Sequence, residues 1–367
     1  MHSSDRPAFV APDVPLAPLT TLGVGGPAQY LARARSRAAL AAAFAWAQRH
    51  GLETQVLGGG SNVVVADAGV AGVVICPLLE GRQVEPGEDG DVILRAGAGE
   101  VWDAVVADAT AKGLTGLECL SGIPGLVGAT PIQNVGAYGQ EVGAVIASVT
   151  AFDARQRTEI VLTPQACGFG YRSSRFTTPP LAGLVICDVA FRLRRGRPEL
   201  SYAELRDEVS RRGNRDTGPA AVREAVLALR RGKGMVVRPE DPDTRSVGSF
   251  FVNPMVPALD VTAWERRGLG RVPGHPQADG RMKVPAAWLI EMAGFTKGFV
   301  KGSVGLSSKH ALAIVNRGGA TAAEVVALAV AIKRAVVDRF GVALVPEPRF
   351  VGFGPDPDVR YLQERGI

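Results

Sequence analysis

The sequence predicts an α+β protein. Short runs of apolar and β-branched residues, such as residues 63–65 and 92–96, are interspersed with amphipathic helical patterns such as residues 36–50. Glycine-rich loops lie between these segments, and the longest, residues 120–139, has no charged side chain. This pattern favours two subdomains in the first half of the chain, with a glycine-rich seam between them for a ligand.

Each predicted element follows from local signals. Ser36 provides an N-cap for the helix that ends near His50, and Thr321 with Glu324 forms a capping box for the helix that ends near Phe340. Further helices are expected at residues 101–111 and 220–231, after Tyr202, and from Pro285. Strands are expected at residues 30–34, 54–57, 63–65, 73–76, 92–96, 148–152, 158–162, 184–192, 311–315 and 343–345.

The composition is that of a globular protein with a sizeable core. The 367 residues are 46% hydrophobic and 21% charged, which allows two or three domains. No run of about 18 apolar residues suggests a membrane span. Residues 1–18 lack the pattern of a signal peptide, so we expect a loose N-terminal extension. The four cysteines lack metal-site spacing, so we expect no bound metal and a cytoplasmic protein with buried thiols at Cys76, Cys119, Cys167 and Cys187.

The net charge of +5 comes mainly from one region. Residues 192–238 hold 13 Lys and Arg side chains against 6 Asp and Glu side chains. A nucleic-acid-binding protein would show a stronger basic bias with interleaved aromatic residues, so we expect no nucleic-acid partner. Either a solvated helical face or the attraction of a small polyanionic substrate explains the excess.

Two glycine-rich loops are candidates for ligand binding. Residues 58–62 (Gly-Gly-Gly-Ser-Asn) lie between two predicted strands, where successive backbone N–H groups can converge on phosphate oxygens. Residues 120–139 contain five glycines and two prolines. A neutral, rigid loop with many backbone donors suits a flat heteroaromatic cofactor that carries a diphosphate. The alternative is a structural turn in a β-rich core.

Eight motifs follow one another between about Thr20 and Gly352. They are residues 58–62, 122–125 (Gly-Ile-Pro-Gly), 131–139 (Pro-Ile-Gln-Asn-Val-Gly-Ala-Tyr-Gly), 170–172 (Gly-Tyr-Arg), 248–251 (Gly-Ser-Phe-Phe), 275–280 (His-Pro-Gln-Ala-Asp-Gly), 287–290 (Ala-Trp-Leu-Ile) and 346–350 (Pro-Glu-Pro-Arg-Phe). Each motif alone carries little information. In this order they resemble the UDP-N-acetylenolpyruvoylglucosamine reductase family.

The resemblance implies a fold and a division into domains. Residues 19–220 would form a FAD-binding domain of the vanillyl-alcohol-oxidase (PCMH) type, with two α+β subdomains divided near residues 75–90. Residues 221–330 would form an α+β substrate-binding domain. The helix and strand of residues 331–367 would close the active site.

The resemblance also implies a reaction. The family reduces UDP-N-acetylglucosamine enolpyruvate to UDP-N-acetylmuramate for peptidoglycan synthesis, with non-covalent FAD and with NADPH as hydride donor. Hydride from flavin N5 reaches the terminal enolpyruvyl carbon and leaves negative charge next to the carboxylate. By resemblance, Ser249 would donate a proton to the neighbouring carbon, and Arg172 and a protonated Glu347 would stabilise the charge.

The remaining site residues also come from the resemblance. Cofactor contacts are expected at Gly58, Gly59, Gly60, Ser61, Asn62, Ser121, Gly122, Ile123, Pro124, Gly125, Gly128, Gln133, Asn134, Gly136 and Ala137. Substrate contacts are expected at Tyr138, Tyr171, Tyr202, Arg230, Lys233, Asn253 and His310. Two features differ from the family pattern, and both concern contacts with the substrate diphosphate. Val252 stands where family members often carry Lys, and the connection from Lys233 to Ser249 is longer than in some relatives.

Two other functions stay open at this point. A different flavoprotein of the same fold would oxidise an alcohol or a sugar, often with flavin tethered through His or Cys. A catalytically silent flavin- or nucleotide-binding module would not require Ser249 or Glu347 for any chemical step. For the reductase we expect a monomer whose partners are the UDP-sugar and NADPH, with no membrane partner.

Overall fold

The computed structural model describes residues 6–212 and 217–364, which divide into two compact units. The first unit contains the described chain up to Val14, with Ala28–Gly60 and Ala71–Val236. The second unit contains Pro15–Pro27, Ser61–Val70 and the described chain from Val237 onward. Each unit is built from several separate stretches of sequence, so neither corresponds to a single run of residues.

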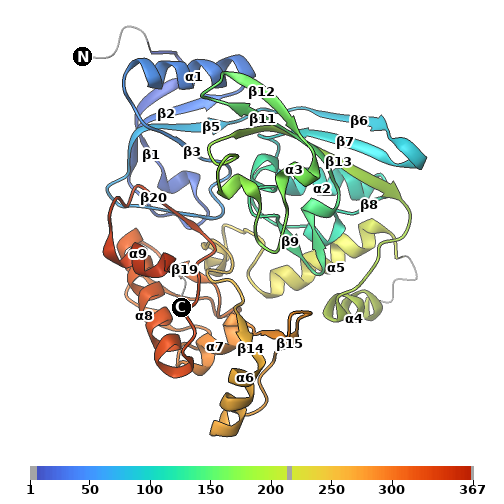
Figure 1. Ribbon diagram of the computed structural model, residues 1–367, viewed down its shortest axis with the longest axis vertical. Coiled ribbons are helices and arrows are strands. Elements are labelled where there is room, and N and C mark those ends of the chain that lie inside the picture. Colours follow the sequence, from blue (N-terminus) through green and yellow to red (C-terminus); the bar gives the residue numbers. More distant parts are fainter. Residues whose placement is uncertain (1–5, 213–216, 365–367) are drawn as a thin grey trace. The chain divides into compact units, whose positions relative to one another are not determined.

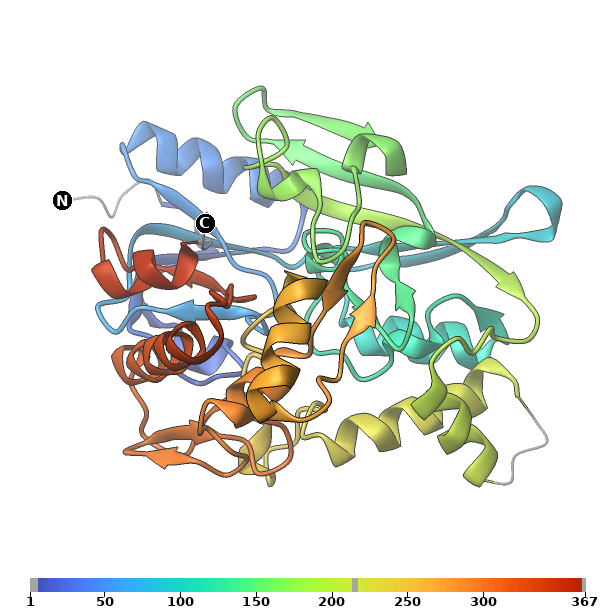
Figure 2. The ribbon, with the colours of Figure 1, turned by 60° about the horizontal axis from the view of Figure 1, so that its bottom comes forward.

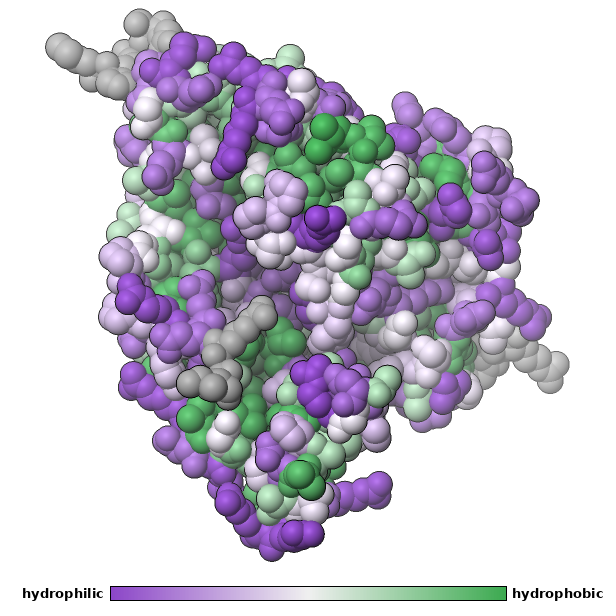
Figure 3. All heavy atoms as spheres, viewed as in Figure 1, coloured by the Kyte–Doolittle hydropathy of each residue, from purple (hydrophilic) through white to green (hydrophobic). Residues whose placement is uncertain are grey.

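The first sheet of the first unit has four strands in the order β1-β2-β5-β3, which are Val10–Pro15, Pro27–Ala34, Val70–Pro77 and Thr54–Val56. Helix α1 (Arg37–Arg49) lies along this sheet (Figure 1) and buries Leu40, Ala43 and Trp46. The predicted Ser36 cap is confirmed, because its hydroxyl accepts the Ala39 N–H at 3.1 Å. The surface of α1 that is visible in Figure 3 is mainly hydrophilic, as expected for a helix that covers a sheet.

The second sheet of the first unit is antiparallel, with the order β12-β11-β13-β7-β6 and with β8 paired to β13. Its strands are β6 (Arg82–Pro86), β7 (Val92–Gly97), β8 (Leu114–Thr115), β11 (Ile146–Asp153), β12 (Thr158–Leu162) and β13 (Val185–Arg195). Helix α2 (Trp102–Ala111) packs into the same core, where Trp102 lies against Phe191. This core holds one end of the glycine-rich loop through Leu120 and Val127.

Three more helices and a short strand pair belong to the first unit, as far as its residues are described. They are α3 (Pro164–Cys167), α4 (Ala203–Arg211), α5 (Pro219–Gly232), β9 (Gly136–Ala137) and β10 (Gln140–Glu141). Buried Leu205 and Val209 of α4 and Val222 and Val226 of α5 share a cluster with Cys119. Helix α5 therefore packs beside the glycine-rich loop.

The described part of the second unit combines three small sheets with four helices. Strands β14 (Met255–Pro257), β16 (Arg281–Lys283) and β15 (His275–Pro276) form one sheet, β17 (Val300–Lys301), β18 (Val304–Leu306) and β19 (Ile314–Asn316) form another, and β20 (Arg349–Val351) pairs in parallel with β4 (Val63–Val65). The helices are α6 (Ala258–Trp264), α7 (Ala286–Met292), α8 (Ala322–Phe340) and α9 (Pro357–Gln363).

The core of the second unit forms around α8, which lies beside α9 (Figure 2). Phe250, Phe251 and Leu289 are fully or almost fully buried in it. The predicted capping box of α8 is confirmed: the Thr321 hydroxyl accepts the Glu324 N–H at 3.1 Å, and the Glu324 carboxylate accepts the Thr321 N–H at 2.9 Å.

Short turns connect these elements. The 3₁₀ turns are Ala17–Leu19, Glu88–Gly90, Glu118–Leu120, Val127–Ala129, Val142–Ala144, Arg175–Thr177 and Pro242–Thr244, and a π-helical turn spans Glu265–Leu269. None of the helices in the described chain is long and apolar enough to cross a membrane.

Several expectations differ from the structure. Residues 10–15, expected within a loose extension, form β1, because Val10 is buried and the strand hydrogen-bonds to β2. The strand expected at residues 343–345 is absent, and regular pairing begins only at Arg349, after Pro348. Helix α5, expected in a separate domain from residue 221 onward, belongs to the first unit.

Candidate active site

The two glycine-rich loops meet within the first unit. A Cβ atom on Gly59 would lie 2.7 Å from the Gly125 Cα, and one on Gly58 would lie 3.6 Å from the Ala129 Cβ. A Cβ on Gly128 would lie 2.7 Å from the Ala98 Cβ. Glycine is thus required at Gly59 and Gly128 for the close approach of one backbone to another. The result is an uncharged cradle of backbone, which we call the glycine cradle and define as Gly58, Gly59 and residues 121–129.

Some donors of the glycine cradle are already committed to the protein. The Val127 N–H donates to the Glu100 carbonyl at 2.9 Å, and the Gly128 N–H donates to the Ala98 carbonyl at 3.0 Å. Ser121 is fully buried, and its hydroxyl donates to the Glu118 carbonyl at 2.7 Å. A cofactor in this cradle would therefore meet backbone whose position is fixed by the surrounding sheet and helices. Ile123 and Pro124 lie half-buried at the turn of the loop.

Asn134 acts as a clamp between three segments. Its side chain donates to the Glu141 carboxylate at 2.8 Å and to the Gly170 carbonyl at 3.0 Å, and it accepts the Gly143 N–H at 2.8 Å. The residue is 2% exposed and has a φ of 46°, a left-handed conformation that Asn tolerates better than most residues. Its amide therefore fixes the loop. The neighbouring Gln133 is half-buried, and Gly136 and Ala137 form the strand β9.

Arg172 lies in a tight turn that is attached to the same loop. Gly170 and Ser173 exchange backbone hydrogen bonds of 3.0 and 3.1 Å across the turn. The Ser174 hydroxyl donates to the Ile132 carbonyl at 2.6 Å. Arg172 has a φ of 51°, which is strained for a residue with a Cβ, and such strain is often stored at functional positions. The neighbouring Tyr171 is exposed.

Four of the expected substrate contacts gather near α5. The Tyr138 and Tyr202 rings meet edge to face with centroids 5.5 Å apart, and the Lys233 Nζ lies 5.6 Å from the Tyr138 centroid. Lys233 also pairs with Glu204 at 2.7 Å. Burial raises the pKa of the Tyr138 hydroxyl to about 12, although the charge of Arg230 acts in the opposite direction.

Arg230 of α5 lies close enough to Tyr138 for their charges to interact, and its Nε is buried. Its guanidinium donates to the Met235 carbonyl at 2.9 Å, and its buried Nε has no hydrogen-bond partner. Burial lowers the pKa of Arg230, and the nearby charge of Arg172 acts in the same direction. A buried cation with an unused donor favours anions in its surroundings.

In the second unit, the segments that carry Ser249 and Glu347 pair with each other. The Glu347 N–H donates to the Phe250 carbonyl at 2.8 Å, and Phe251 and Pro346 form an antiparallel bridge. Phe250 and Phe251 are buried and anchor this segment, whereas Ser249 and Glu347 are half-exposed. The two expected chemical groups therefore lie on paired segments.

Asn62 is hydrogen-bonded to the segment that carries Glu347. Its side chain donates to the Glu347 carbonyl at 3.3 Å, and its own carbonyl accepts the Arg349 N–H at 3.1 Å. The motif of residues 58–62 is thus divided: Gly58–Gly60 belong to the first unit, and Ser61 and Asn62 belong to the second. Gly60 has a φ of 63°, which favours glycine.

The other two expected contacts in the second unit have structural partners. The Asn253 side-chain oxygen accepts the Ala286 N–H at 2.9 Å at the start of α7. The His310 N–H donates to the Ser307 hydroxyl at 3.3 Å. The loop that carries His310 is held by Asp243, whose carboxylate accepts the Ser308 N–H at 3.1 Å.

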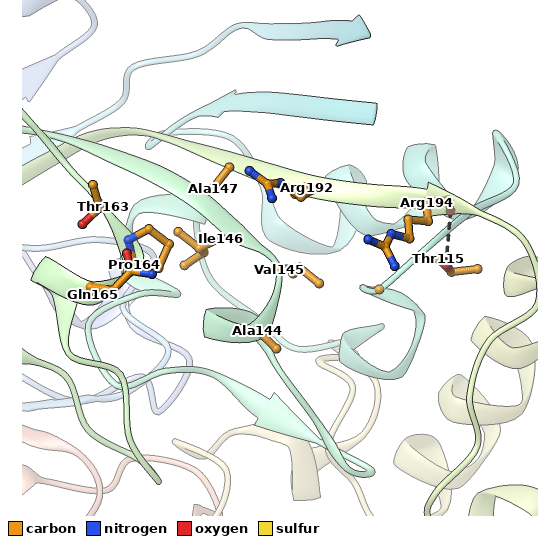
Figure 4. Close-up of a pocket in the computed structure, with 11 residues that line it drawn as sticks. Thr115, Ala144, Val145, Ile146, Ala147, Thr163, Pro164, Gln165, Arg192 and Arg194 are labelled. Carbon is orange, nitrogen blue, oxygen red and sulfur yellow. Dashed lines mark hydrogen bonds between the residues drawn. The ribbon is translucent and has the colours of Figure 1, made fainter. Parts of the chain in front are cut away.

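A separate cavity of about 610 Å³ lies in the first unit beside β13 (Figure 4). Arg192, Arg194 and Thr115 line it, and the Thr115 hydroxyl donates to the Arg194 carbonyl at 3.1 Å. Arg194 is held by Asp91 at 2.7 Å. None of the expected site residues lines this cavity.

Sequence reasoning missed Asp103 and Arg223. Asp103 accepts the Gly122 N–H at 2.6 Å and pairs with Arg223. The two side chains are 120 residues apart, and no spacing pattern links them. Among the described residues, no group of three or more His, Cys, Asp or Glu side chains is arranged to hold a metal ion.

Comparison with known proteins finds two families that match separate stretches of the chain. The family described as "FAD binding domain" matches residues 28–159, and the family described as "UDP-N-acetylenolpyruvoylglucosamine reductase, C-terminal domain" matches residues 240–351. The predicted α+β fold with a FAD-binding domain followed by a C-terminal domain is confirmed.

Whole-length relatives carry the family name. UDP-N-acetylenolpyruvoylglucosamine reductase of Thermobifida fusca is 47% identical over 351 residues, which cover 93% of this chain and 98% of the relative. The reductase of Cutibacterium acnes is 46% identical over 93% of this chain and 90% of the relative. A crystal structure of the reductase from Thermus caldophilus superposes with a TM-score of 0.62 and 28% identity, covering 93% of this chain and 98% of that chain. The chain therefore belongs to the UDP-N-acetylenolpyruvoylglucosamine reductase family.

Proposed function

We propose that this protein reduces the enolpyruvyl group of UDP-N-acetylglucosamine enolpyruvate to give UDP-N-acetylmuramate, a peptidoglycan precursor, with FAD as cofactor and NADPH as reductant. The observation that carries the proposal is the backbone hydrogen bond from Glu347 to Phe250, since it pairs the two segments that carry Ser249 and Glu347. The family relationship supports the same reaction class.

The glycine cradle fits a flavin nucleotide. It has no charged side chain, and its close contacts at Gly59 and Gly128 leave no room for a Cβ. Gly58, Gly59 and residues 121–129 would hold the cofactor, and Asn134 would fix the loop behind it. Bound FAD would supply hydride transfer from NADPH to the substrate.

The protein's own residues would handle charge and protons. Arg172, held in its turn by Gly170 and Ser173, would pair with the substrate carboxylate, where negative charge grows during reduction. The Ser249 Oγ would release its proton to the carbon that carries this carboxylate. Glu347, in its protonated form, would donate a further hydrogen bond. The hydride and the proton would add to the two carbons of the double bond, which becomes a single bond.

The basic cluster near α5 would bind the diphosphate. Lys233 can reach a phosphate as a point charge, and buried Arg230 adds positive potential. Tyr138 and Tyr202 offer ring surfaces and hydroxyl groups beside them. Tyr171, Asn253 and His310 are further proposed contacts. The four buried free thiols suit a reducing compartment such as the cytoplasm.

The test is spectroscopic. The purified protein should be yellow, and anaerobic NADPH should bleach the flavin band. Subsequent addition of the enolpyruvyl UDP-sugar should restore the band with formation of one UDP-N-acetylmuramate per flavin. A flavin that is bleached by alcohols or sugars would support an oxidase instead. A protein that binds flavin but cannot cycle would be a silent binding module, and a colourless protein that cannot be reconstituted would refute the proposal.

A further inference from the structure

The first turn of α2 holds residues 120–125 of the glycine-rich loop at three points. The Trp102 N–H donates to the Gly125 carbonyl at 3.0 Å, and the Trp102 indole N–H donates to the Leu120 carbonyl at 3.1 Å. The Asp103 carboxylate accepts the Gly122 N–H at 2.6 Å. The start of α2 therefore sets the path of residues 120–125.

Gly122 is also pressed against α5. It has a φ of 71°, and a Cβ added there would lie 2.8 Å from the Leu227 Cδ2 and 3.1 Å from the Val236 Cγ2. The Arg230 Nε would lie 3.6 Å from the same Cβ. The loop thus has almost no freedom on this side, and its position depends on α5.

Arg223 of α5 completes the arrangement. Its two terminal nitrogens meet the two Asp103 oxygens at 2.5 and 2.8 Å, a bidentate pair. The Arg223 side chain is only 14% exposed. Burial would raise the pKa of Asp103, but hydrogen bonds from Arg223 and from the Gly122 N–H lower it overall. The Asp103 carboxylate therefore accepts hydrogen bonds from Arg223 and from the Gly122 N–H at the same time.

We propose that Asp103 and Arg223 are positioning residues for the flavin-binding loop: Arg223 orients the Asp103 carboxylate, and the carboxylate fixes the Gly122 N–H and with it the glycine cradle. This inference rests on the proposed binding of FAD at that cradle. The Gly122 N–H is consumed by Asp103, so Gly122 shapes the site without donating to the cofactor. Since Arg223 lies on the helix that also carries Arg230, the pair links the cofactor loop to the proposed diphosphate-binding residues.

The test is the affinity of the apo-protein for FAD, which is measured through the quenching of flavin fluorescence. Asp103→Ala should weaken FAD binding by about tenfold or more, because it removes a charge-assisted hydrogen bond and leaves Arg223 unpaired. Asp103→Asn keeps an acceptor for Gly122 and should give an intermediate loss. Arg223→Gln should weaken binding in the same direction, and the Asp103→Ala/Arg223→Gln double variant should be no worse than Asp103→Ala.

Asp91 provides a control in the same unit. Its buried carboxylate likewise pairs with an arginine, Arg194, at 2.7 Å. Asp91→Ala should lower the melting temperature of the apo-protein, yet leave FAD affinity unchanged. Equal FAD affinities in Asp103→Ala and Asp91→Ala, or additive losses in the double variant, would overturn the inference. Failure of the wild-type protein to bind FAD would instead refute the proposed function.

Discussion

Replacing Asn134 with Ala should damage both stability and catalysis. The substitution deletes three partly buried hydrogen bonds, of 2.8, 3.0 and 2.8 Å, to Glu141, Gly170 and Gly143. At about 1 kcal/mol for each bond, the loss is about 3 kcal/mol. The left-handed φ of 46° adds about 1 kcal/mol, since Ala tolerates it less well than Asn. We therefore expect the free energy of unfolding to fall by about 4 kcal/mol, measured by denaturant titration.

Asn134→Gly separates the two contributions. Glycine removes the hydrogen bonds but accepts a positive φ, so this variant should lose about 3 kcal/mol. Gly170 stands two residues before Arg172, so both variants should also slow the reoxidation of reduced flavin by the substrate more than its reduction by NADPH. Stopped-flow absorbance separates the two half-reactions.

A second buried asparagine serves as the control. Asn316, in the second unit, donates to the Leu22 carbonyl at 3.0 Å and accepts the Gly318 N–H at 2.9 Å. Asn316→Ala should cost similar stability without the selective effect on flavin reoxidation. An Asn134→Ala protein within about 0.5 kcal/mol of wild type would show that the clamp contributes little beyond ordinary surface positions, and the reasoning would be wrong.

Three further predictions concern the chemistry and its pH dependence. Ser249→Ala should leave bleaching by NADPH intact but slow flavin reoxidation by the substrate about 10²- to 10⁴-fold, and normal single-turnover reoxidation would remove Ser249 as proton donor. Arg172→Lys should reduce the same half-reaction about tenfold or more, because a point charge cannot replace a bidentate guanidinium, and unchanged steady-state turnover would count against this role. The lowered pKa of Asp103 means that its stabilising contribution is complete above the ordinary carboxyl pKa of about 4 and is lost as the pH falls through its folded-state pKa. Asp103→Asn should therefore flatten the acid limb of the stability curve in denaturant titrations between about pH 2 and 5, and an unchanged acid limb would contradict the assignment.

Local signals in the sequence predicted the regular elements well. The Ser36 cap and the Thr321–Glu324 capping box are both present, because capping depends only on residues three positions apart. The prediction of a strand at residues 343–345 was wrong. The apolar run before Pro346 has the composition of a strand, but the segment forms only an isolated bridge, between Pro346 and Phe251. Short apolar runs without a visible partner are ambiguous for this reason.

The site was predictable only where backbone chemistry dominates. Glycine content identified the cradle, whereas the Asn134 clamp and the Asp103–Arg223 pair depend on single side chains that meet across long stretches of sequence. The pairing of the Ser249 and Glu347 segments likewise joins residues that are 98 positions apart, and only family resemblance pointed to it. Such contacts leave no periodic signal in one sequence.

The contacts within the glycine-rich loop fit a structural turn, and this interpretation is compatible with the proposed role of the loop as a cofactor site. Gly59 and Gly128 are needed because a Cβ atom on either would lie only 2.7 Å from a neighbouring carbon atom, and Gly122 gives its N–H to Asp103. These glycines therefore build the loop, and a ligand must use donors that the protein has not claimed. A cofactor in such a cradle meets groups that are already oriented, which reduces the entropy that binding must otherwise remove. Loss of a structural contact, such as the hydrogen bond from Gly122 to Asp103, should consequently weaken cofactor binding without deleting any group that touches the cofactor.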